Sequence, residues 1–479
     1  MSPTRVSALG VSVFTALAVI ACGGGGSGGM TAGIDRGGIT IAQGPITGFG
    51  SVIVNGVRFS TTGATILVNG VAATEADLAI GQVVRVEGTV DAGGTTGTAQ
   101  SVTFEDNVTG PIESIDLASG RLVVLGQPVQ TGPATSFDDG IVPRSLEGLA
   151  VGDRVEVSGL VAADGVIIAT RIERSAAADD LEVRGTVSGL DADARHFAIN
   201  ELEVDYSAAQ LEDFPAGGPA DGDLVEVHGT LDAGGLLVAS RVERKDRALP
   251  GDEDDQADLE GLVTRFVSAT DFDVAGQPVT TNADTEFRNG SATNLALGVN
   301  IEVEGNFDGS GRVVADKIEF RHSADAEIRI DGFVDEVDSS AGTLVVLGVT
   351  VRTDAVTRFE DHSEDRLKEF AIGDLRVGDF VELRAYDDGA TLIATRLERD
   401  DPEDEVEVRG RASDLAAPTF RVAGVAVETT PGTEFEREDE AIDASTFFDE
   451  AADRVVKVDG QWDGSKLTAD KAEIEENDD

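Results

Sequence analysis

The four histidines are the residues best suited to metal or acid–base chemistry in this chain of 479 residues. They are His196, His228, His322 and His362. No two of them lie three or four residues apart, which is the spacing that places two imidazoles on one face of a helix around zinc. The spacing therefore predicts no metal site.

The residue pattern also gives no indication of a catalytic site. No Ser-His-Asp or Cys-His arrangement can be proposed from the spacing. Asp and Glu number 90, so any acid–base pair chosen among them would be arbitrary. We therefore expect a protein that is not an enzyme, with no catalytic residue and no cofactor.

Five pairs of a cation and a glutamate recur two residues apart, which places both side chains on one face of a strand. These pairs are Arg171/Glu173, Arg241/Glu243, Lys317/Glu319, Arg396/Glu398 and Lys471/Glu473. Glutamates of the preceding strand face four of them, namely Glu156, Glu226, Glu302 and Glu382. We interpret the pairs as cross-strand ion pairs worth only tenths of a kcal/mol each, and not as a binding site.

A phenylalanine recurs after a threonine at equivalent points of the chain. The residues are Phe137, Phe287, Phe359 and Phe435, with Leu211 near the same place in another copy. A row of aromatic rings can form a stacking surface for bases or sugars, or each ring can fill a small core. Because leucine packs but does not stack, its presence favours the core.

The elements that would position these residues repeat six times. "VGDRVEVSGLVAADGVIIATRIER" (151–174) and "DGDLVEVHGTLDAGGLLVASRVER" (221–244) are visibly one pattern, and related segments begin at Ile80, Leu297, Val377 and Ala452. Polar and apolar residues alternate with period two, and a glycine-rich turn interrupts the alternation. Each copy therefore predicts a hairpin of two strands.

Further short strands precede each hairpin. In the first copy, Asn55-Gly56 and Asn69-Gly70 predict tight type I′ turns, and Thr74 with Asp77 predicts a short capped helix. Three strands, a variable or helical link and two more strands form the order of an OB-type barrel. We predict an all-β tandem array of six small five-stranded OB-like barrels, with split barrels and sandwiches as the alternatives.

The predicted organisation has eight parts. They are a signal peptide (1–21), a lipidated cysteine with a Gly-rich tether (22–40), and β modules 1 to 6 at 41–106, 107–175, 180–245, 258–322, 326–400 and 404–476. Acidic segments at 175–180, 246–258, 323–327 and 399–405 are interpreted as extended, solvated linkers, because dense like charges repel. Weak divalent cation binding by these linkers is the alternative.

The charge balance excludes one class of partner. Lys and Arg number 37, so the formal net charge is -53. Nucleic acids are bound mainly through Lys and Arg on phosphates, and this field has the opposite sign. No nucleic-acid partner is expected.

The N-terminus carries an export signal. Residues 6–21 are apolar, follow Arg5 and are too short to span a bilayer, which is typical of a secretory signal. Val19-Ile20-Ala21-Cys22 resembles a bacterial lipobox, which implies lipid attachment at Cys22. Gly23 in place of the aspartate that retains lipoproteins at the inner membrane implies the outer membrane.

The whole chain resembles an uncharacterised bacterial family of envelope lipoproteins with tandem small all-β domains. The likeness rests on Val19 to Cys22 with its glycine tail and on "GPITGFGSVIVNGVRF" (44–59) and "ATILVNGVAATEADLAIGQVVRVEGTV" (64–90). The resemblance implies location and architecture but no activity.

We therefore predict a non-catalytic, membrane-anchored scaffold or binding protein of the cell envelope, held by the Cys22 lipid and presenting its modules to an envelope protein or polymer. The alternatives are an acidic, calcium-responsive adhesion or matrix protein, and a secreted repeat protein without lipid.

Overall fold

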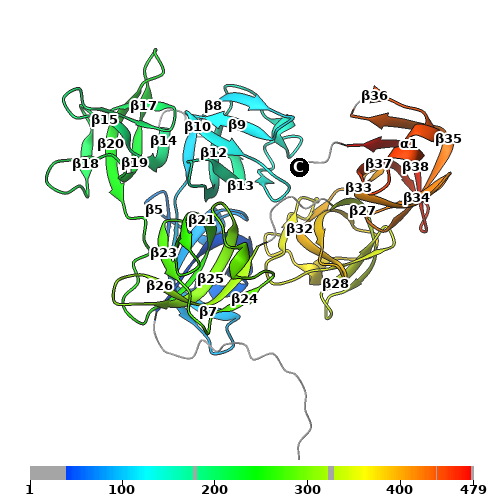
Figure 1. Ribbon diagram of the computed structural model, residues 1–479, viewed down its shortest axis with the longest axis horizontal. Coiled ribbons are helices and arrows are strands. Elements are labelled where there is room, and N and C mark those ends of the chain that lie inside the picture. Colours follow the sequence, from blue (N-terminus) through cyan, green and yellow to red (C-terminus); the bar gives the residue numbers. More distant parts are fainter. Residues whose placement is uncertain (1–38, 176–180, 322–327, 439, 476–479) are drawn as a thin grey trace, which may run out of the picture.

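A computed structural model describes residues 39–175, 181–321, 328–438 and 440–475, and these residues form six all-β modules (Figure 1). The modules span 40–104, 108–174, 181–245, 256–320, 328–400 and 406–474. The predicted signal peptide, Cys22 and the tether lie outside the described residues. Within the described part of the chain, no helix has the length and apolar character needed to cross a membrane.

The first three modules contain strands β1 to β20. Module 1 consists of β1 (Thr40–Gly48), β2 (Val52–Val54), β3 (Val57–Ser60), β4 (Thr65–Val68), β5 (Val71–Ala73), β6 (Val83–Val90) and β7 (Thr96–Phe104). Module 2 consists of β8 (Val108–Asp116), β9 (Arg121–Val124), β10 (Gln127–Gln130), β11 (Ser136–Phe137), β12 (Arg154–Val161) and β13 (Ile167–Arg174). Module 3 consists of β14 (Leu181–Thr186), β15 (Ser188–Asp191), β16 (His196–Ile199), β17 (Leu202–Asp205), β18 (Gln210–Glu212), β19 (Leu224–Leu231) and β20 (Leu237–Lys245).

The last three modules contain strands β21 to β38. Module 4 consists of β21 (Gln256–Ser268), β22 (Asp271–Val274), β23 (Gln277–Thr280), β24 (Glu286–Arg288), β25 (Asn300–Phe307) and β26 (Val313–Phe320). Module 5 consists of β27 (Ile328–Asp338), β28 (Thr343–Val346), β29 (Val349–Arg352), β30 (Arg358–Asp361), β31 (Phe380–Asp387) and β32 (Leu392–Asp400). Module 6 consists of β33 (Val406–Ala416), β34 (Thr419–Val422), β35 (Val425–Arg437), β36 (Glu440–Ala441), β37 (Val455–Trp462) and β38 (Leu467–Ile474).

Each module closes into a five-stranded barrel, as module 2 illustrates. The first strand, β8, pairs antiparallel with both β9 and β12, β9 pairs with β10, and β12 pairs with β13. The barrel closes where β10 and β13 run parallel, with Val129 opposite Ile167. This strand order confirms the predicted OB-like barrel.

The turns and helices follow the local sequence signals. Asn55 and Gly56 have φ angles of 51° and 80°, as the predicted type I′ turn requires. A short 3₁₀ helix, η1 (Glu75–Asp77), begins after Thr74, whose backbone N–H donates to Asp77 Oδ2 at 2.8 Å. The other helices are η2 (Leu146–Gly148), η3 (Ala292–Asn294), η4 (Ile372–Asp374) and α1 (Ala444–Glu450).

The barrels associate in three pairs through their first strands. In modules 2 and 3, β8 pairs antiparallel with β14, and in modules 5 and 6, β27 pairs antiparallel with β33. In modules 1 and 4, β1 and β21 pair in parallel from Thr40 opposite Gln256 to Gln43 opposite Leu259. Modules 1 and 4 therefore share one sheet, although modules 2 and 3 lie between them in the sequence (Figure 1).

The hydrophobic cores follow this pairing. One continuous core runs through modules 2 and 3, and another runs through modules 5 and 6. Modules 1 and 4 keep separate cores, but Ile41 of module 1 packs into the core of module 4. Because a barrel of this size buries a modest apolar area, sharing a core stabilises both members of a pair.

The interpretation of 246–258 as an extended, solvated linker is wrong for Leu249 and for 256–258, whereas Asp252, Glu253 and Asp254 are exposed. Leu249 is buried in the core of module 4, and Asp258 is buried in β21, where it accepts a hydrogen bond from Asn55 Nδ2 of module 1 at 2.8 Å. The apolar surface offered by neighbouring barrels outweighs the repulsion among the acidic side chains. At 399–405, Arg399 and Asp400 likewise belong to β32, whereas 176–180 and 323–327 lie outside the described residues.

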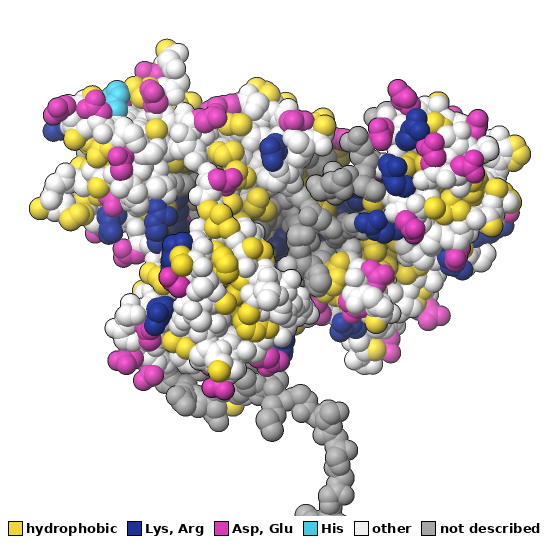
Figure 2. All heavy atoms as spheres, in the orientation of Figure 1, with side chains coloured by type: hydrophobic (Ala, Val, Ile, Leu, Met, Phe, Trp, Pro, Cys, Tyr) yellow, Lys and Arg dark blue, Asp and Glu magenta, His cyan; other side chains and the backbone are white. Residues whose placement is uncertain are grey.

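On the face shown in Figure 2, acidic side chains are scattered and do not gather in one patch.

Candidate functional site

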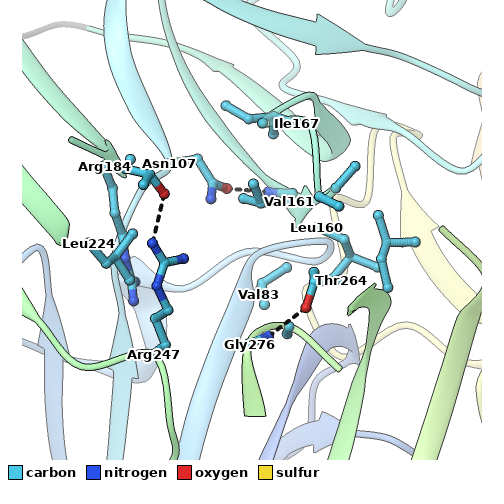
Figure 3. Close-up of a pocket in the computed structure, with 18 of the residues that line it drawn as sticks. Val83, Asn107, Leu160, Val161, Ile167, Arg184, Leu224, Arg247, Thr264 and Gly276 are labelled. Carbon is cyan, nitrogen blue, oxygen red and sulfur yellow. Dashed lines mark hydrogen bonds between the residues drawn. The ribbon is translucent and has the colours of Figure 1, made fainter. Parts of the chain in front are cut away.

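A cavity of about 560 Å³ lies where modules 1 to 4 meet. Its walls come from β6 of module 1, the β12–β13 hairpin of module 2, β14 of module 3, the connection after β20, and β21 and β22 of module 4 (Figure 3). A volume of this size accommodates a small molecule or a short segment of a polymer.

One wall of the cavity is aliphatic. Leu160, Val161 and Ile167 of the β12–β13 hairpin lie opposite Val83 of module 1 in Figure 3. A hydrogen bond of 2.7 Å from the backbone N–H of Gly159 to Asn107 Oδ1 ties this hairpin to the start of module 2. This hydrogen bond between a backbone N–H and a side chain therefore fixes the position of the apolar wall on one side.

The other wall carries arginines. Arg184 pairs with Glu105 at 2.9 Å, and Arg247 Nη2 donates to Thr186 Oγ1 at 2.9 Å and to the Gly222 carbonyl at 3.0 Å. Arg265 contacts Asp271 and Asp273 at 2.6 and 2.7 Å. These guanidinium groups are fixed at the rim of the cavity, in a protein that is otherwise strongly acidic.

A second region of charged side chains joins module 2 to module 5. Arg144 of module 2 donates from Nη2 to both carboxylate oxygens of Asp400 at 2.6 Å. Arg396 Nη1 donates to the Thr135 carbonyl at 2.7 Å, and Ser136 Oγ donates to Glu360 at 2.5 Å. Most of these groups are buried, so the contact is a specific interface between barrels that are distant in sequence.

The loop that follows β30 extends this interface to module 1. Lys368 Nζ donates to the carbonyl oxygens of Glu75 and Leu78 at 2.7 and 2.9 Å. It also lies 4.4 Å from the centre of the Phe49 ring, a cation–π distance. The variable link of module 5 therefore anchors modules 5 and 6 to the first two barrels.

Comparison with known proteins gives the chain its family. A family model described as "Domain of unknown function (DUF5666)" matches residues 40–103, 109–173, 184–243, 260–319, 331–398 and 404–473. The chain belongs to the DUF5666 family. Each DUF5666 copy coincides with one barrel, which confirms the expected family of tandem domains.

Other comparisons add little to the DUF5666 assignment. No curated protein matches the sequence. A solved structure titled "drosophila Unr CSD456" is similar at 14% identity over 45% of this chain and 97% of that chain, with a TM-score of 0.12. A superposition of that quality carries no argument about fold or function.

The cation–glutamate pairs of the DUF5666 copies form on the strands predicted for them. Arg241 reaches Glu226 at 3.1 Å and Lys317 reaches Glu302 at 3.2 Å, as expected. Arg171 and Arg396 pair with Glu173 and Glu398, and each also contacts a neighbouring module: Arg171 donates to the Ile80 carbonyl of module 1, and Arg396 donates to the Thr135 carbonyl of module 2. Both arginines are buried between barrels, so the predicted value of tenths of a kcal/mol, which holds for exposed pairs, does not apply to these two.

The recurring phenylalanines pack inward. Phe137 and Phe435 are buried, and Phe287 and Phe359 are partly buried against the cores of their modules. The core interpretation is confirmed for these residues. Leu211, however, is 41% exposed, so it does not replace a core ring in module 3.

The histidines have different surroundings. His196 is exposed beside Asp205, and His322 lies outside the described residues. Among the described residues, two groups that include a histidine are close enough to hold a metal ion, namely Glu182, Glu226 and His228 in module 3, and Glu360, His362 and Glu398 in module 5. Spacing along the chain does not reveal them, because the members come from different strands.

Proposed function

We propose that this DUF5666 chain is a non-catalytic, membrane-anchored envelope lipoprotein that acts as a multi-module scaffold and binds a ligand in the cavity among modules 1 to 4. The observation that carries the proposal is the cavity itself, because four barrels contribute to one set of walls. A concave site shared by several modules is characteristic of binding sites.

The apolar and basic walls define the chemistry of the ligand. The aliphatic side chains of the β12–β13 hairpin favour an apolar segment, and the fixed guanidinium groups of Arg184 and Arg247 favour acidic or hydroxyl groups. A polyanion such as nucleic acid is disfavoured by the net charge of -53. We therefore expect an amphipathic envelope molecule or an extended segment of an envelope polymer or protein.

The proposed anchor is the lipid on Cys22. Several acyl chains on one residue give durable attachment, whereas a single chain binds reversibly. The glycine-rich segment after Cys22 would act as a tether between the membrane and the barrels.

The experiment compares two variants of the anchored full chain. Ala163→Trp places an indole at the cavity wall in the β12–β13 turn, and Ala233→Trp places it at the equivalent turn of module 3, outside the cavity. Material captured from native membranes is compared by mass spectrometry, with Cys22→Ser as a test of anchoring.

We expect a ligand captured by the wild-type chain and by Ala233→Trp but lost from Ala163→Trp. Equal capture by the two tryptophan variants would refute binding in the cavity. Full membrane retention of Cys22→Ser would refute the anchor.

A further inference from the structure

A histidine is buried at the interface of modules 2 and 5. His362 follows β30, and its Nδ1 lies 2.6 Å from Asp139 Oδ1 of module 2. The Asp139 carboxylate also accepts a hydrogen bond from Arg366. A carboxylate on Nδ1 fixes the proton there and directs the Nε2 lone pair to the opposite side of the ring.

That opposite side faces two glutamates. His362 Nε2 lies 3.3 Å from Glu398 Oε1 and 3.8 Å from Glu360 Oε2. Neither Nε2 of His362 nor Oε2 of Glu398 has a hydrogen-bond partner, although the side chains are only 7% and 1% exposed. Buried polar atoms without a partner are rare in proteins, and a bound ion can satisfy such atoms.

One carboxylate oxygen of each glutamate is held by a hydrogen-bond donor that fixes its orientation. Ser136 Oγ donates to Glu360 Oε1 at 2.5 Å, and Arg396 Nε donates to Glu398 Oε1 at 2.8 Å. Metal ligands are commonly held by outer hydrogen bonds of this kind. Glu398 thus keeps Oε2 without a donor, and Glu360 keeps Oε2, which lies 3.7 Å from Arg171 Nη1.

The spacing of the three side chains suits a small transition-metal ion. Two ligands about 2.1 Å from a tetrahedral zinc ion lie about 3.4 Å apart, and one ligand atom from each of the three side chains lies within 4.8 Å of the other two. One imidazole and two carboxylates form a mixed nitrogen and oxygen set. Calcium requires six to eight oxygen ligands, more than this group supplies.

We propose that Glu360, His362 and Glu398 bind one Zn²⁺ ion at the interface of modules 2 and 5, with Asp139 of module 2 orienting the imidazole. The site is distinct from the cavity among modules 1 to 4, so it does not depend on the function proposed above. All three ligands belong to module 5, so the ion fixes the imidazole that Asp139 contacts and thereby supports the interface of modules 2 and 5.

A proton is the competing occupant of His362 Nε2. Although burial opposes the charge, the carboxylates of Glu398 and Glu360 raise the pKa of His362. An imidazolium contacting Glu398 and Asp139 would occupy the same space as the metal. The experiment must therefore distinguish a metal ligand from a purely structural ion pair.

The experiment titrates the full chain with Zn²⁺ by calorimetry and, separately, with Co²⁺ by visible spectroscopy. The variants are His362→Gln, Asp139→Asn and the control His196→Gln, whose imidazole is exposed in module 3. Circular dichroism of each variant shows whether its barrels have folded.

We expect one tight Zn²⁺ equivalent and tetrahedral Co²⁺ absorption in the wild type and in His196→Gln. His362→Gln should lose the site, and Asp139→Asn should weaken Zn²⁺ binding roughly tenfold to 100-fold, as is typical when an outer carboxylate is removed. Asp139→Asn keeps all three ligands, so it tests the site even if His362→Gln fails to fold.

Two results would overturn the proposal. One is the absence of a saturable Zn²⁺ equivalent in the wild type, which would leave a structural imidazolium as the occupant. The other is unchanged Zn²⁺ affinity in folded His362→Gln or in Asp139→Asn, which would place any bound ion elsewhere.

Discussion

The buried histidine clusters of modules 3 and 5 contain similar residues but differ in which barrel supplies the partners of the histidine. In module 3, His228 Nε2 lies 2.5 Å from Arg241 Nη2 and 2.9 Å from Glu226 Oε1. In module 5, His362 Nε2 has no hydrogen-bond partner, and its Nδ1 contacts a residue of another barrel. In module 3 the histidine is thus contacted by an arginine of its own hairpin. In module 5 the histidine is contacted by a carboxylate of module 2.

The two clusters also differ in how many partners each charge has. In module 3, Lys245 contacts Glu105, Glu226 and Glu243, each at 3.0 Å. In module 5, by contrast, Glu398 is the only carboxylate among the described residues that lies within ion-pair distance of Arg396. Loss of one group should therefore be tolerated in module 3 and costly in module 5.

The largest effect is expected for Glu398→Ala. This change leaves the buried guanidinium of Arg396 without its carboxylate, and breaking a buried ion pair typically costs about 3 to 5 kcal/mol. Trp462 of module 6 packs against the core shared with module 5, so its fluorescence during urea unfolding reports the loss.

The matched change in module 3 is Glu226→Ala. Arg241 and Lys245 keep other carboxylates there, and the repulsion between Glu226 and Glu182 is relieved. Calorimetry should show a clearly smaller loss than for Glu398→Ala. Equal losses would contradict the difference in redundancy between the two clusters.

An intermediate effect is expected from pH. Burial, together with repulsion by Glu226 and Asp106, raises the pKa of Glu182 from 4.5 to about 9. The folded state therefore binds a proton that the unfolded state releases, so stability falls as the pH rises from about 4.5 to about 9. Burial also raises the pKa values of Asp258 and Asp331 to about 7, so these two groups likewise make the stability fall as the pH rises.

Glu182→Gln removes one of these titrating groups. The Tm of the wild type should fall by several degrees between about pH 5 and pH 9, and the variant should show a smaller fall when both are measured by calorimetry. An unchanged pH dependence would mean that Glu182 is ionised in the folded protein. Glu398 provides the contrast, because Arg396 and His362 hold its pKa well below the usual range despite burial.

The barrels were predictable from the sequence because their signals are local. Alternation with period two sets the strands, and Asn55-Gly56 sets a turn whose positive φ angles few other residues adopt. Phe137 was correctly assigned to the core, although Leu211, the residue on which that assignment rested, is exposed. Each of these features depends on residues close together in one module.

The charged interface was not predictable because it depends on how modules meet. Asp139, His362 and Glu398 come from two barrels and three separate segments, so no spacing along the chain connects them. Arg396 was recognisable as part of a strand pair, but its burial is caused by module 2. The pairing of module 1 with module 4 could likewise not be predicted from the order of the copies along the chain.

The smallest effect is expected for Arg184→Met beside the cluster of module 3. Glu105 accepts hydrogen bonds from both Arg184 and Lys245, at 2.9 and 3.0 Å, so it keeps one cation when Arg184 is lost. The Arg184 side chain is also 29% exposed, and a partly hydrated pair is worth roughly 0.2 to 1 kcal/mol. Methionine retains the aliphatic contacts of the arginine stem. A loss in calorimetric stability as large as that of Glu398→Ala would show that redundancy of partners does not protect module 3.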